Sequence, residues 1–158
     1  GLTMKNLSGF GLVAYGARTK IILEKVTVAN CQSSGVIVTG GAKLDATDCQ
    51  FHQNGWSGVD VRGFRTTTRL TNCTSHHNKD AGVSVESGAV VDLMGEGTSV
   101  HDNRDGLSAF DRGSTINVYQ PCVLNKMSHG NNQRNINTSG QPTTGGTIQQ
   151  KDNPDKHK

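Results

Sequence analysis

The chain is poor in apolar and aromatic residues. Of its 158 residues, only 32% are hydrophobic and 4% are aromatic, which is less than a compact globular domain of this length usually carries. No apolar run approaches the roughly 18–20 residues that a membrane-spanning helix needs, and no charged-then-apolar signal peptide stands at the start. The composition therefore disfavours both a compact globule and a membrane span.

A strong charge of either sign is also missing. Sixteen Lys and Arg residues against 13 Asp and Glu residues give a formal net charge of +3. Part of this excess, Lys151, Lys156 and Lys158, is interleaved with Asp152 and Asp155 near the end of the chain. The excess is too small and too scattered to predict a nucleic-acid partner. No motif indicates a cofactor, so none is expected.

The four cysteines show no zinc or redox spacing, but three of them share a period. Cys49 and Cys73 lie 24 residues apart and Cys122 follows 49 residues later, whereas Cys31 falls out of step. A buried stacking position suits a small, mildly apolar side chain, and this is the interpretation we favour. Stacked strands lie ~4.8 Å apart, so a Cys49–Cys73 disulfide also stays open on distance alone. The redox compartment is left undetermined.

What the chain has in place of apolar mass is a repeat of the pattern Gly-apolar-any-apolar. Successive glycines are separated by 24, 23, 24 and 24 residues. The five copies are Gly11–Ala14, Gly35–Val38, Gly58–Val61, Gly82–Val85 and Gly106–Ala109. A second glycine column, suited to a bend with positive φ, ends the copies at Gly16, Gly40, Gly63, Gly88 and Gly113. Short alternating strands at this period are typical of a β-solenoid.

A third segment of each coil aligns without gaps in three copies, Thr47–Asn54, Thr71–Asn78 and Glu96–Asn103. Each copy ends in asparagine, a residue that tolerates a left-handed backbone and can bond side chain to side chain in a stack. The pattern predicts an asparagine ladder along one bend. Further on, Gln120–Asn125 matches the same segment.

The chain begins within a coil, because Leu2–Asn6 matches Val26–Asn30 at an offset of 24. An uncovered solenoid end is a template for strand pairing. We therefore expect either earlier repeats before this coil or an end-to-end oligomer formed through it.

The order Asn…Gly-Val-x-Val…Gly-Ala…apolar resembles the right-handed parallel β-helix repeats of the pectate-lyase-like superfamily. The repeats are more similar still to those of the "right-handed β-helix region" proteins. The resemblance covers residues 2 to about 127 and implies an all-β solenoid of about five to six coils of 23–25 residues, with three parallel sheets wound right-handedly. Such proteins include polysaccharide lyases, glycoside hydrolases, uronate epimerases, phage tailspikes and non-catalytic adaptors, so the resemblance selects a fold rather than an activity.

The repeat also divides the chain. Residues 1–127 are expected to form β-helix repeats, and residues 128–150 an irregular last coil or C-terminal cap anchored by Ile136 and Ile148. Residues 151–158 are polar and are expected to form a flexible tail.

The first strand of each coil offers the main candidate site. Its middle residue points outward, which brings Asp60, Arg62 and Glu86 together on one face as the candidate catalytic residues. The full candidate binding set is Tyr15, Trp56, Asp60, Arg62, Glu86, Phe110, Asp111 and Arg112. A saccharide groove would use the aromatic rings for stacking and the carboxylates as acid and base or as hydroxyl acceptors. The simpler alternative is a surface Arg62–Glu86 salt bridge worth about 0–1 kcal/mol.

A second column contains His52, His76 and His101, with His77 and Asp102 beside it. Imidazoles on consecutive rungs are candidate transition-metal ligands, although parallel rings do not converge tetrahedrally without rotamer changes. The alternatives are a hydrogen-bonded polar bend and a pH-sensitive patch, since stacked imidazolium rings repel one another.

Three hypotheses of function follow. The first is a non-catalytic module that binds a polysaccharide or protein partner through its solenoid face, as part of a longer repeat protein or of a surface or viral appendage. The second is a fragment of a carbohydrate-active enzyme, and the third is a self-stacking structural solenoid. An extracellular, cell-surface or viral-surface location fits the first hypothesis best.

Overall fold

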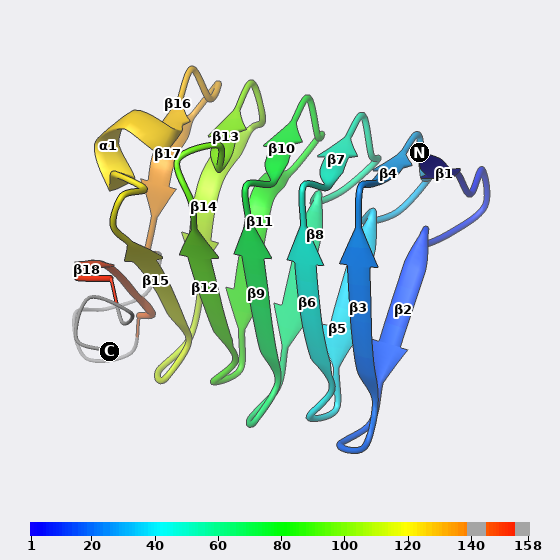
Figure 1. Ribbon diagram of the computed structural model, residues 1–158, viewed down its shortest axis with the longest axis horizontal. Helices are drawn as coiled ribbons and strands as arrows, with labels where there is room; N and C mark the ends of the chain where they lie inside the picture. The colour runs from blue at the N-terminus through cyan, green and yellow to red at the C-terminus, as the bar shows by residue number, and fades with distance from the viewer. Residues whose placement is uncertain (139–144, 154–158) are drawn as a thin grey trace.

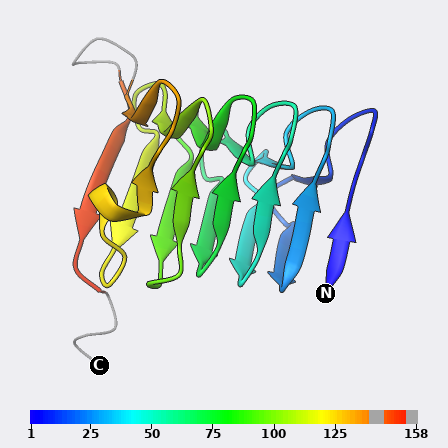
Figure 2. The same cartoon turned by 90° about the horizontal axis from the view of Figure 1, so that it is seen from above.

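The computed structural model describes residues 1–138 and 145–153 of the protein. This part of the chain winds into a β-solenoid of about five turns, in which successive strands join three parallel six-stranded sheets in turn. Figures 1 and 2 show the rungs stacked along one long axis, with the first strand, β1, and the last, β18, at opposite ends of the stack. The predicted all-β, three-sheet fold is confirmed.

Each sheet takes every third strand of the coils. Sheet A contains β1 (Leu2–Met4), β4 (Val26–Ala29), β7 (Gln50–His52), β10 (Thr74–His76), β13 (Ser99–His101) and β16 (Ser128–His129). Sheet B contains β2 (Leu12–Tyr15), β5 (Val36–Thr39), β8 (Val59–Arg62), β11 (Ala81–Glu86), β14 (Asp105–Ala109) and β17 (Arg134–Asn137). Sheet C contains β3 (Lys20–Glu24), β6 (Lys43–Thr47), β9 (Thr67–Thr71), β12 (Val90–Met94), β15 (Thr115–Tyr119) and β18 (Thr147–Lys151).

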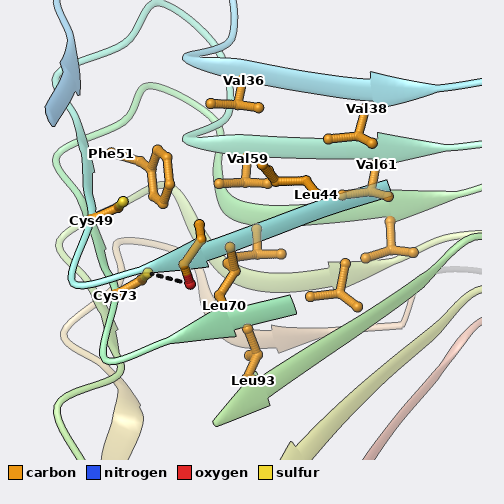
Figure 3. Packing of buried hydrophobic residues seen from close by; sticks show 14 of the residues in the cluster. Val36, Val38, Leu44, Cys49, Phe51, Val59, Val61, Leu70, Cys73 and Leu93 are labelled. Atoms are coloured by element: carbon orange, nitrogen blue, oxygen red, sulfur yellow. Dashed lines mark hydrogen bonds between the residues drawn. The ribbon is translucent and has the colours of Figure 1, made fainter. Parts of the chain in front are cut away.

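The core is a narrow column of side chains between the three sheets. The two apolar positions of each Gly-apolar-any-apolar copy point into it, as Val59 and Val61 do from sheet B. Leu70 from sheet C and Phe51 from sheet A meet them there (Figure 3). Since each rung supplies only a few apolar side chains to a core that its neighbours close, a low hydrophobic content is sufficient.

The predicted asparagine ladder is present and is longer than the sequence alignment indicates. The Asn54 side-chain amide donates to the Asn78 oxygen at 2.9 Å, Asn78 donates likewise to Asn103 at 2.9 Å, and Asn103 to Asn131 at 3.1 Å. At its head, the Cys31 backbone N–H donates to the Asn54 side-chain oxygen at 3.1 Å. Cys31 therefore occupies an asparagine position of the repeat, which explains why it falls out of step with the other cysteines.

The cysteines follow the favoured interpretation. All four are free and buried. The Cys73 thiol lies 3.4 Å from the carbonyl oxygen of Ala46, a contact drawn as a dashed line in Figure 3. Burial raises the pKa of Cys73 to about 12 and that of Cys122 to about 11. At neutral pH both are thiols that serve as small core side chains.

The alignment of Gln120–Asn125 with the third segment is wrong. These residues lead into the short helix α1 (Leu124–Met127), and β16 begins only at Ser128, where His129 pairs with His101. The inserted helical turn shifts the register of this coil, so the true match to the third segment lies several residues further on.

The last coil continues the three sheets. Ile136 in β17 and Ile148 in β18 pair with apolar residues of the preceding rung, and Ile148 packs against the core. Lys151, the first residue of the expected tail 151–158, is the last residue of β18. The rest of that tail from residue 154 onward lies outside the described residues.

Candidate functional site

The outer face of sheet B carries a row of polar residues, which we call the floor of sheet B. Asp60, Ser84, Ser108 and Asn137 lie side by side on consecutive strands, and the first three each follow a valine or leucine of the core. The sequence predicts Asp60, Ser84 and Ser108 to point away from the core, and they do, but they are not solvent-exposed: Asp60 is 2% exposed and Ser108 is 1% exposed. The Ser108 hydroxyl is also among the buried polar atoms of the described residues that have no hydrogen-bond partner.

The three candidate catalytic residues are in contact, but with a different pairing from the expected one. Arg62 donates two hydrogen bonds to Asp60, two residues earlier on the same strand, one from Nε at 2.8 Å and one from Nη2. Its Nε lies 3.8 Å from the Glu86 carboxylate on the neighbouring strand. The same-strand contact with Asp60, rather than the cross-strand contact with Glu86, is therefore the close ion pair.

The surroundings of this cluster keep Arg62 charged and raise the pKa of Glu86. The hydrogen bond to Asp60 raises the pKa of Arg62 and keeps its guanidinium charged. Burial raises the pKa of the Glu86 carboxyl, and the nearby Arg62 charge opposes that shift only in part. Because both oxygens of Asp60 accept hydrogen bonds from Arg62, Asp60 is occupied as an acceptor. The cluster therefore consists of the Asp60–Arg62 ion pair and the partly buried carboxyl of Glu86.

Trp56 lies at the bend that precedes β8, with 57% of its surface exposed. Beside it is a pocket of about 180 Å³ that is also lined by Gly55, Lys79, Asp80 and Arg104. Arg104 forms an ion pair with Asp80 in this pocket. The expected binding residue Trp56 therefore stands next to a charged and polar hollow, which we call the Trp56 corner.

A charged network connects the Trp56 corner to the floor of sheet B. Arg104 lies 3.8 Å from the Asp105 carboxylate, which also accepts hydrogen bonds from Arg134, at 3.2 and 3.3 Å, and from Asn137, at 3.1 Å. Sequence reasoning missed Asp80 and Arg104 because they lie in bends, and Asp105 because it is the first residue of β14, just before the aligned Gly-apolar-any-apolar copy. The available signal was their position, one or two residues after the asparagine ladder.

The other candidate binding residues are spread along the face. Tyr15 lies two rungs before Arg62 in the same column, and its ring packs close to Gly40. Phe110, Asp111 and Arg112 follow β14 at the far end. The structure thus does not bring Tyr15 together with them.

Two exposed aromatic residues, Phe10 and Phe64, were missed, and Phe64 is the more exposed of the two. Phe64 follows β8, whereas Trp56 precedes it. The Arg65 guanidinium lies 5.4 Å from the centre of the Phe64 ring. The position of Phe64 one residue past the second glycine column was the signal for an outward ring at a bend. Exposed aromatic rings therefore stand at both ends of β8.

The histidine column forms a continuous ladder on sheet A. His52, His76 and His101 stack with nearly parallel rings, at centroid distances of 4.9 and 5.1 Å, and His129 extends the stack at 5.4 Å. His129 was missed because α1 lengthens the coil before it. The described residues contain no group of three or more potential metal ligands gathered around one point, so the ladder by itself is not a closed metal centre.

The stacking has an electrostatic consequence that predicts acid sensitivity. Burial, followed by the charges of its neighbours His52, His101 and His77, lowers the pKa of His76 from 6.5 to about 4, while Asp102 opposes the shift. Because the unfolded ring binds its proton more readily, stability is fully present above about pH 6.5 and is lost as the pH falls toward 4. We expect a His76→Gln variant to lose about 1 kcal/mol less stability than the wild type between pH 7.5 and 4.5, allowing for solvent screening of this partly exposed ring.

Urea unfolding of both proteins at the two pH values measures this difference. Comparing wild type with variant cancels the contribution of the carboxylates, which titrate in both. Equal losses of stability in the two proteins would show that the ladder does not carry the acid sensitivity.

Sheet C carries a third polar surface that sequence reasoning did not single out. A hollow of about 260 Å³ is lined by Lys20, Lys43, Asp45, Thr67, Thr68, Arg69 and Asp92. Lys20 and Asp45 form an exposed ion pair at 3.1 Å. Its lining includes no aromatic ring, so it is a weaker candidate for ligand binding than the Trp56 corner.

The solenoid with three parallel sheets defines the protein as a parallel β-helix protein. Comparison with models of known families matches residues 1–146 to the family described as "Right handed beta helix region", and the chain belongs to this family. The match confirms the resemblance to the right-handed β-helix region proteins and the right-handed winding that it implies. No curated protein and no solved structure matches the chain. In the described residues, no helix has the length and apolar character needed to cross a membrane.

Proposed function

We propose that the protein is a non-catalytic module that binds a glycan on the outer face of sheet B, centred on the Trp56 corner. The observation that carries the proposal is a half-exposed indole beside a pocket whose other lining residues are Gly55, Lys79, Asp80 and Arg104. Sugar rings have an apolar face that stacks on an indole and hydroxyls that need donors and acceptors. The corner offers both within one hollow.

The charges of the face favour a neutral glycan over an acidic one. Arg62 is held by Asp60, Arg104 by Asp80, and Arg134 by Asp105. Guanidinium groups that already bind carboxylates are poor receptors for the carboxylate of a uronic acid. The paired groups retain lone pairs and N–H donors for neutral hydroxyls.

The same pairing supports binding rather than catalysis. A glycosidase needs two carboxyl groups with separate roles, one of them free to act as base or nucleophile. Asp60 has both oxygens engaged by Arg62, and Glu86 is the one candidate acid whose raised pKa suits proton donation. One free carboxyl is too few for a glycosidase, but it can accept a hydrogen bond from a sugar hydroxyl.

A Trp56→Ala variant tests the proposal. A glycan array with the wild type first identifies a neutral ligand, and calorimetry then measures its affinity. Loss of the aromatic contact, worth about 1.5 kcal/mol, is expected to weaken binding about tenfold. Lys79→Gln should weaken it less, by about threefold, because one solvent-exposed hydrogen bond is lost.

The control is Ile22→Ala, which removes an exposed apolar side chain on sheet C, and it should bind as the wild type does. Binding of the neutral ligand should also change little between 0.15 and about 1 M salt. An array without hits, or a ligand that Trp56→Ala binds as tightly as the wild type, would contradict the proposal. An array in which only acidic glycans bind, with binding that falls steeply as salt is raised, would show that the charge argument is wrong.

A further inference from the structure

The histidine ladder on sheet A contains one pair of rings arranged differently from the rest. The Nδ1 atoms of His76 and its chain neighbour His77 lie 2.8 Å apart, with the two rings nearly perpendicular, at 84°. On the adjacent rungs, His52 Nδ1 faces the Gln53 amide oxygen at 3.1 Å, and His101 Nδ1 faces the Asp102 carboxylate at 2.7 Å. Only the middle rung of these three places two imidazole nitrogens face to face.

From this geometry we infer that His76 and His77 form a two-nitrogen chelate for a divalent transition metal of the copper(II) or nickel(II) kind. Two nitrogens 2.8 Å apart, each about 2.0 Å from a shared metal, subtend an angle of about 90° at it. That angle fits neighbouring positions of a square-planar or tetragonal site, which copper(II) and nickel(II) prefer. A tetrahedral zinc site would need the two nitrogens further apart, at about 3.3 Å.

The surroundings supply the remaining requirements. The two Nδ1 atoms share one hydrogen bond, so a metal that displaces its proton finds both nitrogens already in position. Asp102 is exposed on the next rung, and the hydrogen bond from His101 lowers the pKa of its carboxyl, so it adds negative charge beside the chelate. Because the described residues gather no three ligands around one point, water completes the coordination of the metal.

Titration of the metal-free protein with copper(II) chloride tests the inference, followed by calorimetry and by the nitrogen couplings in the electron paramagnetic resonance spectrum. We expect one equivalent to bind with two nitrogen ligands. The His77→Asn variant should bind at least tenfold more weakly. Asparagine tolerates the left-handed backbone at this position, where φ is 55°, so the variant is expected to keep the fold.

Two further variants separate the chelate from generic binding by a histidine-rich surface. His129→Asn removes the ring at the end of the ladder and should leave the affinity unchanged. Gln53→His places a second imidazole beside His52 in the same relative position, and should raise the stoichiometry from one to two. Wild-type affinity in His77→Asn, equal weakening in His129→Asn, or one equivalent in Gln53→His would each overturn the inference. Circular dichroism of every variant excludes unfolding as the cause.

Discussion

Replacing Asn78 with alanine is expected to destabilise the protein by about 3–5 kcal/mol, enough to unfold much of it near body temperature. Asn78 is buried in the middle of the asparagine ladder. Its side-chain oxygen accepts from the backbone N–H of Asn54 at 3.1 Å and from the Asn54 amide at 2.9 Å. The buried Asn54 N–H would lose its acceptor and the Asn54 amide would keep only its 3.4 Å bond to the Val28 carbonyl oxygen. Each loss of this kind costs about 1–3 kcal/mol.

The hydrogen bonds that the Asn78 amide donates allow a second test of the ladder. Its amide nitrogen donates to the carbonyl oxygen of Phe51 at 3.1 Å, to the Ser75 hydroxyl at 3.2 Å and to the Asn103 oxygen at 2.9 Å. An Asn78→Asp variant has nearly the same shape, but it turns a carboxylate oxygen toward the Phe51 and Asn103 oxygens. We expect it to be destabilised at least as much as Asn78→Ala at neutral pH, because a buried charge without its donors is costly.

Urea unfolding curves measure both variants, with Asn125→Ala as the control. Asn125 lies exposed in α1, so its replacement should change stability by less than about 0.5 kcal/mol. If Asn78→Ala unfolded at the wild-type urea concentration, the ladder would be a consequence of the winding rather than a source of its stability.

The fold could be predicted from the sequence because each rung repeats the same local requirements. The glycine spacing gave the period, and stacked residues such as Asn54 and Asn78 recur at that period. The register of the parallel sheets then followed, since a residue one period later lies on the next rung. The helix α1 broke this argument near the end, because an insertion changes the register without leaving a mark in the hydrophobic pattern.

The candidate site was less predictable, because it depends on rotamers and bends. Arg62 lies beside both Asp60 and Glu86 in any β-strand alignment, and only the structure shows that the guanidinium turns to Asp60. Asp80 and Arg104 come from bends, where column alignment says little about side-chain direction. The floor residue Asp60 was predicted to point outward, but its burial results from neighbouring side chains that the repeat does not specify.

The second large effect is expected at the opening glycine of a coil. Gly58 does not have the positive φ of the second glycine column, such as Gly63 at +95°, so its backbone alone would admit alanine. A Cβ there would lie 2.1 Å from the Ser75 hydroxyl oxygen, 2.8 Å from the Asn78 amide nitrogen and 2.8 Å from the carbonyl oxygen of Gly82. Ser75 can rotate, but the Gly82 carbonyl is backbone of the next rung and cannot yield without separating the strands.

We therefore expect Gly58→Ala to cost about 3 kcal/mol or more, at the upper end of overpacking penalties, in urea unfolding. Gly9→Ala is the matched control, since its Cβ would meet only the Asn6 amide, at 3.5 Å, and its φ lies outside the left-handed range. A control loss below about 0.5 kcal/mol beside a large loss at Gly58 would assign the effect to rung contact rather than to chain entropy. Similar losses in the two variants would refute this account. The repeated glycine that reveals the solenoid in the sequence is thus explained by the close approach of its rungs.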